Sequence, residues 1–378
     1  MFLGIDSPRI AIIGASGASE AELSYYFNYE SEGVKSYIDR FSAAGFTAVY
    51  VPLTIDNYRT VGESDYFKAV IESCHGVYFL GGNQFFSARS LLRDDGDYNK
   101  LGQAIVNLYN KGGIIMGSSA GAHVISNPCF QDGVSYDALR CNGAEYVDIC
   151  SNENSSSPAA QISGNNIYYK SINVANLAVG TSAVFDSHFN ARGRLGRLII
   201  LARDIEAKYA IGLDENTGLA VSNGVGICIG TGGVTIVDTS EATWIKGETF
   251  AVENIKIHYL TAGDSFNFNT GEFTPSGKSE FTNQDLFKEN TNDIPNIFDY
   301  SYATTRGLVS FVFGNETMHT FYALGEDEDD TPFEVNVYKR ENTQIYYSNS
   351  KYSAINALTN YNKCGYSNLY ISICISDN

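Results

Sequence analysis

The feature that most constrains the fold is a series of short, continuous apolar runs that alternate with segments of helical periodicity. The runs lie at Arg9–Gly14, Thr47–Val51, Gly76–Leu80 and Gly113–Met116. Apolar residues at the spacing of one helix face follow the first run, and further helices are expected at Asp65–Ser73, Phe85–Leu92 and Leu101–Tyr109. Strands that are apolar on both faces and alternate with helices are typical of a parallel sheet covered on both sides. The first half of the chain therefore predicts an α/β fold, in which helices sandwich a mostly parallel sheet.

After about Tyr209 the rhythm changes, because short strand patterns follow one another without intervening helices. These patterns lie at Ala210–Leu213, Gly218–Val221, Gly226–Ile229, Val234–Val237 and Lys256–Leu260. The polar stretch Asn269–Asn296 resembles a connector, and strand-like alternation returns at Phe333–Tyr338 and Leu369–Ile375. We therefore expect a main domain of residues 1–268 and a C-terminal, β-rich extension of residues 269–378. Residues 297–378 are expected to form a separable or peripherally docked piece.

Composition excludes several classes of function. The formal net charge is −18, with 25 Lys and Arg, so a nucleic-acid partner is not expected, whereas a cationic substrate would be tolerated. The seven cysteines are scattered and form no CxxC pair, which argues against a zinc site. No apolar stretch approaches the roughly 20 residues of a membrane span, and the first residues show no signal-peptide pattern. The compartment stays open, although abundant Tyr, Asn and Ser favour an exported protein. The acidic run Gly325–Asp330 is interpreted as a solvated loop rather than a calcium site.

The strongest local motif is Gly117–Ala122, which contains a GxSxG pattern directly after an apolar strand and before a helix start. A serine on such a sharp strand-to-helix turn is exposed for nucleophilic attack, and small neighbours let the turn close. The free N–H groups of the helix start could hold an oxyanion, with Ala120 as the natural donor. The motif therefore predicts that Ser119 is a nucleophile. The alternative is a tight Gly- and Ser-rich turn that only packs or binds an anion.

A nucleophilic serine needs a base, and the chain has five histidines, at positions 75, 123, 188, 258 and 319. His123 lies four residues after Ser119, one turn along the same helix. His188 lies where a strand meets a loop, which is where a parallel sheet usually carries its catalytic groups. The chemistry favours His188 over His123 without excluding the latter. Asp214 and Glu215 follow a strand and would point opposite ways, so one of the two is expected to orient the base.

Three arginines lie within six positions just after His188, at Arg192, Arg194 and Arg197. Guanidinium groups bind carboxylates in a bidentate fork, so this cluster could hold an acidic substrate. The cluster could equally pair with the protein's own Asp and Glu residues. The order Ser, His, acid also differs from the α/β-hydrolase order, which disfavours an esterase of that class.

Four motifs together resemble the cyanophycinase and aspartyl-dipeptidase family of serine peptidases. Gly81–Gln84 resembles the family's GGDQ loop, and Gly117–Ala122 is similar to its GTSAGA elbow. Asp186–Leu198 resembles DQHFxxRGRLGRL, and Ile211–Thr217 is similar to GIDEDTA. The resemblance covers roughly residues 8 to 267. It implies a flavodoxin-like or class-I-amidotransferase-like fold, commonly a homodimer, with no metal or organic cofactor.

The resemblance also implies a role for each matching position. Ser119 would be the nucleophile, His188 the general base and Glu215 the orienting acid of a triad that forms an acyl-enzyme. The oxyanion would be held by the N–H groups of Gly82 and Ala120. The substrate, an aspartyl peptide such as β-Asp-Arg, would be bound by Asn83, Gln84, Asp186, Arg192, Arg194 and Arg197.

Two positions depart from the family pattern, because Asn83 stands where Asp is usual and Ser187 where Gln is usual. About a hundred residues after position 267 also have no counterpart in the minimal enzyme. The motif around the nucleophile is intact, whereas the motifs that are expected to set substrate specificity are partly changed. The alternative is therefore that the chain is a catalytically inactive relative of this family and serves as a binding or surface protein.

Overall fold

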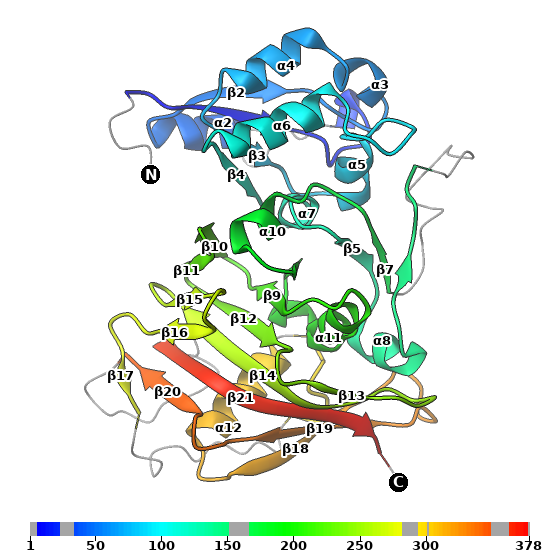
Figure 1. The fold of residues 1–378 in the computed structure, drawn as a ribbon, viewed down its shortest axis with the longest axis vertical. Coiled ribbons are helices and arrows are strands. Elements are labelled where there is room, and N and C mark those ends of the chain that lie inside the picture. Colours follow the sequence, from blue (N-terminus) through cyan, green and yellow to red (C-terminus); the bar gives the residue numbers. More distant parts are fainter. Residues whose placement is uncertain are drawn as a thin grey trace. The chain divides into compact units, whose positions relative to one another are not determined.

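The computed structural model of the chain describes residues 6–22, 34–150, 166–281, 294–300, 302–348 and 363–376. It contains two compact units, which we describe separately (Figure 1). Unit 1 comprises Met1–Gln131, Tyr146–Ser163 and Ile167–Ala175, and unit 2 comprises Asp132–Glu145, Gly164–Asn166 and Asn176–Asn378.

Unit 1 holds a parallel sheet of four strands in the order β2-β1-β3-β4. Its strands and helices are β1 (Arg9–Ile13), α2 (Val34–Ala43), β2 (Thr47–Val51), α3 (Tyr58–Val61), α4 (Asp65–Glu72), β3 (Gly76–Phe79), α5 (Gln84–Arg89), α6 (Lys100–Asn110), β4 (Ile114–Gly117) and α7 (Ala120–Val124). A three-stranded sheet has the order β5-β7-β6, from β5 (Cys129–Asp132), β6 (Glu145–Tyr146) and β7 (Ile167–Tyr169). The predicted strands of the first half are thus confirmed to within about a residue at each end.

Helices cover both faces of the parallel sheet. Successive residues of a strand point to opposite faces, so both faces of an apolar strand need a covering layer. On one side Ala11 and Ile13 belong to a large buried cluster that also contains Ile105 of α6. On the other side Ile12 packs against Phe41 of α2. The predicted sandwich of helices around a parallel sheet is therefore confirmed for this unit.

Unit 2 is richer in β-structure. Its elements are α8 (Ser135–Cys141), β8 (Ala183–Ser187), η1 (Asn190–Arg192), α11 (Leu195–Asp204), β9 (Tyr209–Leu213), β10 (Thr217–Ser222), β11 (Val225–Gly230), β12 (Gly233–Asp238), β13 (Thr243–Ile245), β14 (Ala251–Thr261), β15 (Ser265–Asn267), β16 (Glu272–Thr274), β17 (Ser279–Glu280), α12 (Ala303–Phe313), β18 (Met318–Ala323), β19 (Phe333–Tyr338), β20 (Gln344–Tyr347) and β21 (Cys364–Ile375). The short helix α10 (Val174–Val179) crosses from unit 1 into unit 2.

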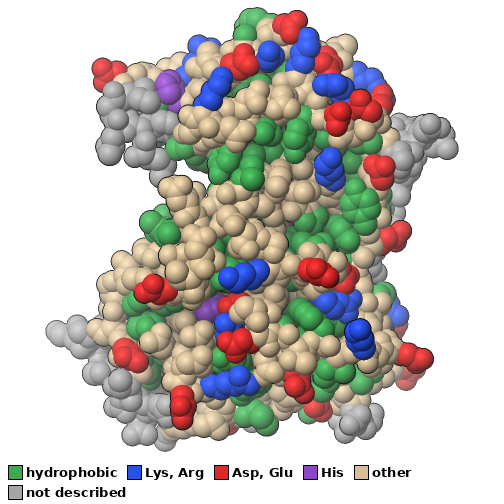
Figure 2. Space-filling view, viewed as in Figure 1, with side chains coloured by type: hydrophobic (Ala, Val, Ile, Leu, Met, Phe, Trp, Pro, Cys, Tyr) green, Lys and Arg blue, Asp and Glu red, His purple; other side chains and the backbone are tan. Residues whose placement is uncertain are grey.

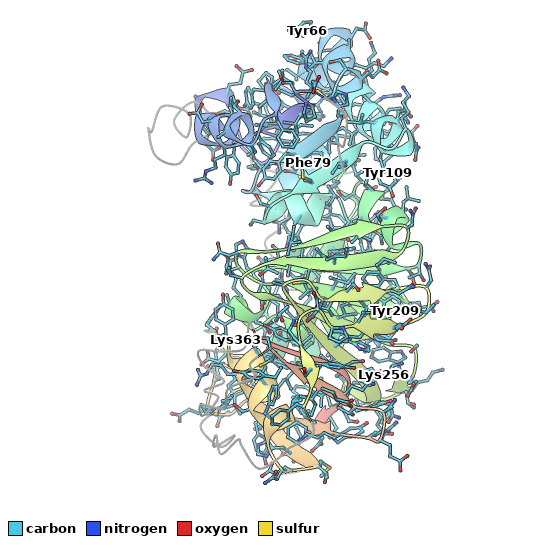
Figure 3. The ribbon with its side chains drawn as sticks, turned by 90° about the vertical axis from the view of Figure 1, so that its left-hand side faces the viewer. Tyr66, Phe79, Tyr109, Tyr209, Lys256 and Lys363 are labelled. Atoms are coloured by element: carbon cyan, nitrogen blue, oxygen red, sulfur yellow. The ribbon has the colours of Figure 1, made fainter. Side chains whose placement is uncertain are left out.

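The main sheet of unit 2 begins with the parallel pair β8–β9 and continues antiparallel through β12, β14 and β21. Tyr209 of β9 and Lys256 of β14 both belong to it (Figure 3). A second, antiparallel sheet has the order β10-β11-β15-β16. The expected α/β class with a β-rich C-terminal region is therefore confirmed.

The C-terminal residues are not a separable or peripheral piece, contrary to expectation. Strand β21 pairs with β14 in the middle of the main sheet, and β19 pairs with β21 in turn. Phe311 of α12 is 1% exposed. Residues 282–293 of the expected connector lie outside the described residues. The prediction failed because the apolar strand β21 is paired on both sides, with β14 on one side and with β19 and β20 on the other, and so leaves no unpaired edge. The boundary at residue 268 itself stays a proposal about where the family resemblance ends.

The described part of the chain contains no helix that is long and apolar enough to cross a membrane. Nor do its residues form any group of three or more His, Cys, Asp or Glu that could hold a metal ion. On the face drawn in Figure 2, acidic and basic side chains are interspersed rather than gathered into a basic patch.

Candidate active site

Ser119 lies on a tight turn between β4 and α7 in unit 1. Its backbone has φ 52 and ψ −118, a conformation that a residue with a side chain rarely adopts. A Cβ added to Gly117 would lie 2.1 Å from the carbonyl oxygen of Gly121, and one added to Gly121 would lie 2.3 Å from that of Phe79. The two glycines of the GxSxG motif are therefore required by the close packing of the turn. Strain of this kind is expected of a nucleophile elbow.

The Gly81–Gly82 loop lies beside this turn. A Cβ on Gly81 would be 3.3 Å from Cβ of Ser119. Ser16 fixes the loop, since its Oγ donates to the carbonyl of Gly81 at 2.6 Å and its own carbonyl accepts from the N–H of Asn83 at 3.1 Å. Within the described residues, neither the N–H of Gly82 nor that of Ala120 donates to an acceptor. Both N–H groups could therefore donate to the oxyanion that forms when a serine attacks the carbonyl of a substrate.

Asn83 and Gln84 make hydrogen bonds within unit 1. Asn83 Oδ1 accepts from the N–H of Phe85 at 2.9 Å and so caps α5, a role that Asn fills as well as Asp. Gln84 Nε2 donates to the carbonyls of Phe130 and Gln131 at 3.2 and 2.8 Å. The replacement of Asp by Asn at position 83 therefore preserves the local structure. A role of either side chain in substrate binding stays a prediction.

His188 and Glu215 lie close together in unit 2. Each follows the carboxyl end of a strand, and those strands, β8 and β9, are parallel neighbours with Ser187 opposite Leu213. His188 Nδ1 is 2.6 Å from Glu215 Oε1, and the two side chains are 24% and 42% exposed. A carboxylate at this distance favours a proton on Nδ1, which leaves Nε2 as a proton acceptor. The pair therefore has the geometry of a general base and its orienting acid.

Asp214 binds the loop that follows His188 instead. Its Oδ1 accepts from both the backbone N–H and the Nδ2 of Asn190, at 3.1 and 2.9 Å. Burial raises the pKa of Asp214 to about 6, although the hydrogen bonds from Asn190 oppose the change. Of the two carboxyl groups that the sequence left open, Glu215 is therefore the one that meets His188, and Asp214 holds the loop after it.

The buried carboxylate of Asp186 binds two of the three clustered arginines. Asp186 is 1% exposed and lies 2.9 Å from Arg194 and 2.7 Å from Arg197, and Arg197 also donates to the carbonyl of Gly133 at 2.8 Å. Burial lowers the pKa of Arg194 to about 10, against the attraction of Asp186. Asp186, Arg194 and Arg197 thus bind one another and stabilise the loop, and a role in substrate binding stays a prediction for them. Arg192 is exposed and makes no ion pair with a described residue, so its guanidinium is the most accessible of the three.

Residues far along the chain hold the loop that follows His188, and sequence reasoning missed them. Gly193 has φ 57, and a Cβ there would lie 1.9 Å from the carbonyl oxygen of Phe298. The N–H of Tyr302 donates to the carbonyl of Asn190 at 3.1 Å. Ser135 Oγ donates to the carbonyl of Gly193. The glycine was visible in the motif, but Phe298 and Tyr302 carry no sequence signal, because they lie beyond every recognisable motif.

The predicted catalytic residues therefore form two local groups. Ser119 lies in unit 1 with Gly82 and Ala120, while His188 and Glu215 lie in unit 2. The alternative base, His123, is on α7 in unit 1 and is 3% exposed.

Comparison with known proteins gives curated relatives and solved structures. No protein-family model matches the chain. A cyanophycinase from Synechococcus elongatus is 26% identical over 241 residues, which is 62% of this chain and 65% of that protein. A cyanophycinase from a Nostoc species is 27% identical over 266 residues, covering 67% of this chain and 78% of that one. The match to the first relative thus spans less than two thirds of its length. The crystal structure of a peptidase from an acI-B1 actinobacterium is 17% identical, with a TM-score of 0.45 over 69% of this chain and 84% of that one.

Proposed function

We propose that this chain, a relative of the cyanophycinases, is a serine-type peptidase that forms an acyl-enzyme on Ser119. The observation that carries the proposal is the strained backbone of Ser119 between two glycines that the turn requires. A solvated or merely packed turn has no need of such a conformation, whereas a nucleophile elbow depends on it. The paired His188 and Glu215 supply the remaining chemistry of a triad.

In the proposed mechanism, Nε2 of His188 accepts the proton of Ser119 as Oγ attacks the scissile carbonyl. Glu215 holds the imidazole through Nδ1 and stabilises the imidazolium that forms. The N–H groups of Gly82 and Ala120 donate to the oxyanion of the tetrahedral intermediate. His188 then protonates the leaving amine, and the same groups activate water to hydrolyse the acyl-enzyme.

The proposed substrate is an aspartyl peptide, with β-Asp-Arg as the first candidate. A β-linked aspartyl residue carries a free α-carboxylate, for which the exposed Arg192 provides a bidentate partner. A protein of net charge −18 tolerates the cationic arginine of this substrate. Both features, together with the cyanophycinase relatives, support this substrate. A homodimer, which the resemblance implies, is part of the same proposal.

The alternative is a catalytically inactive relative that binds a partner without catalysis. Labelling by a fluorophosphonate probe distinguishes the two, because only an activated serine reacts at a useful rate. We expect the wild-type protein to be labelled and Ser119→Ala to be inert, with unchanged thermal unfolding. An unlabelled wild-type protein that still binds aspartyl peptides would favour the alternative.

Hydrolysis assays test the assignment of the base and the substrate. On β-Asp-Arg, Ser119→Ala and His188→Ala should each lose several orders of magnitude in kcat, as loss of a triad member does, while His123→Ala changes kcat little. An inactive His123→Ala beside an active His188→Ala would overturn the choice of base. Comparable turnover of β-Asp-Arg and an Ala-Ala peptide would overturn the choice of substrate, because a site built for polar groups rejects analogues that lack them.

A further inference from the structure

Strand β10 is an edge strand in unit 2. It forms a hairpin with β11 through Asn223 and Gly224, whose φ values of 50 and 75 are those of a type I′ turn. In the sheet order β10-β11-β15-β16, β10 is the outermost strand, and no described strand pairs with its other side. An unpaired edge presents backbone N–H and C=O groups to any chain that can extend alongside it.

The ladder to β11 fixes which groups face outward. The N–H of Thr231 donates to the carbonyl of Asn216 at 3.0 Å, and a two-residue hairpin closes on a hydrogen-bonded pair. Hydrogen-bonded and non-bonded pairs alternate, so the residues between them turn their backbone groups away from β11. These residues are Thr217, Leu219 and Val221, and no described residue outside the β10–β11 ladder hydrogen-bonds with their backbone.

This edge begins at the proposed catalytic pair. Thr217 follows Glu215 by two residues, and its Oγ1 donates to the carbonyl of Glu215 at 2.9 Å and accepts from the N–H of Gly232 at 2.9 Å. The start of β10 is therefore fixed relative to the carboxylate that bonds His188. At a rise of about 3.3 Å per residue, Leu219 lies roughly 7 Å along the strand from Thr217. A peptide paired with the edge would therefore begin beside the loop that carries Glu215.

The exposed face next to this edge is apolar. Ile227 and Ile229 of β11 are 44% and 55% exposed, and they lie opposite Ala220 and Gly218 of β10. The small residues on β10 leave these side chains uncovered, and a Cβ at Gly218 would lie 3.3 Å from Cγ1 of Ile229. A strand added beyond β10 would place one of its side chains against this apolar surface. The strand itself carries no charged residue.

We propose that β10 binds the substrate as an added strand, through the outward backbone groups of Thr217, Leu219 and Val221. The inference rests on the proposed peptidase function and names its substrate class. The substrate is a peptide whose extended, α-linked segment of about four residues or more lies to one side of the scissile bond. A β-linked backbone has an additional methylene in each repeat and does not keep the register of a strand. An apolar residue of that segment contacts Ile229.

The first test is the dependence of kcat/KM on peptide length. Aspartyl peptides extended by one to six alanines, at the amino or the carboxyl end, are compared as substrates of the wild-type protein. One of the two series should gain activity up to about four to five added residues and then level off. Methylating single amide nitrogens in the longest peptide should lower kcat/KM by about three- to tenfold at every second position, as expected for one hydrogen bond each. Equal kcat/KM at all lengths in both series would overturn the proposal.

The second test is a matched pair of variants at one position. Leu219→Pro removes the outward N–H without removing a bond to β11, whereas Leu219→Ala shortens the same side chain and keeps the N–H. Leu219→Pro should lose the gain from peptide length, and Leu219→Ala should retain it, with thermal unfolding checked for both. Equal losses in the two variants would show that the side chain, not the edge, is responsible.

A binding measurement separates this inference from the proposed function. Fluorescence anisotropy with a labelled hexapeptide and the Ser119→Ala protein requires no turnover. Binding that Leu219→Pro weakens and Leu219→Ala preserves supports the edge even if Ser119 proves not to be the nucleophile. Absence of peptide binding would overturn the inference and leave the labelling of Ser119 unaffected. A dimer in sedimentation equilibrium that Leu219→Pro dissociates would also overturn it, because a second copy would then occupy the edge.

Discussion

Gly193→Ala tests whether the C-terminal residues hold the loop after His188, and Gly277→Ala is its matched control. Both glycines have positive φ, 57 and 63, so an alanine costs about 1–2 kcal/mol at either position. At Gly193 the new Cβ would also lie 1.9 Å from the carbonyl oxygen of Phe298, whereas at Gly277 nothing lies within 4 Å. Overpacking of this kind costs a further 1–3 kcal/mol or so. Gly193→Ala should therefore unfold about 2–12 °C below Gly277→Ala, at about 2–4 °C per kcal/mol for a unit of this size.

The same pair of variants has different consequences for catalysis. Backbone that moves away from Phe298 at Gly193 moves the loop that begins at His188, and a displacement of about 1 Å can cost roughly 10²-fold in rate. We expect kcat to fall for Gly193→Ala and to stay near the wild-type value for Gly277→Ala, measured on β-Asp-Arg below the unfolding temperature. Equal melting temperatures for the two variants would refute the contact with Phe298. A lower melting temperature with unchanged kcat would refute the link from this contact to the base.

Three further predictions concern charged side chains of unit 2. Asp186→Asn should lower the free energy of unfolding in urea by about 3–5 kcal/mol, because it leaves Arg194 and Arg197 without their buried carboxylate. Arg192→Ala should change the free energy of unfolding by less than about 0.5 kcal/mol. The same variant should raise KM for β-Asp-Arg. An Arg192→Ala variant with unchanged KM would remove it from the substrate site. Asp214 has a pKa raised from 3.8 to about 6 in the folded protein, so its contribution of roughly 3 kcal/mol is present below pH 4 and is lost as pH rises through 6. Asp214→Asn should flatten this part of the stability curve between pH 4 and 7, and an unchanged slope would contradict the assignment.

Much of the fold could be predicted because its signals are local. An apolar run such as Thr47–Val51 predicts a strand of an α/β sheet, and the structure gives this strand the same bounds. It lies at the edge of the sheet, and only Val51 of its residues is buried. The elbow was equally visible, since a strand, two glycines and a helix start are contiguous in the chain. The sequence placed His188 and the two acids Asp214 and Glu215 after strands but left the choice of acid open. The family resemblance implied Glu215, and the structure places Glu215 beside His188.

The roles of the charged residues near His188 could not be predicted in the same way. The sequence left open whether the arginines bind a substrate or a carboxylate of the protein. Burial explains the pairing of Arg197, because a guanidinium that is almost fully enclosed, at 2% exposure, must be paired within the protein. Which residues enclose a side chain depends on elements that meet only in the folded chain.

The sequence by itself predicted the strands and helices of the first half, the tight turn at Ser119 and a preference for His188 as the base, because each depends on residues that are neighbours in the chain. Only the tertiary structure decided that β21 enters the main sheet beside β14 and that Phe298 packs on Gly193. These contacts join residues about a hundred positions apart. Which of these long-range contacts form depends on how the whole chain buries its apolar surface, and a local sequence pattern does not contain this information.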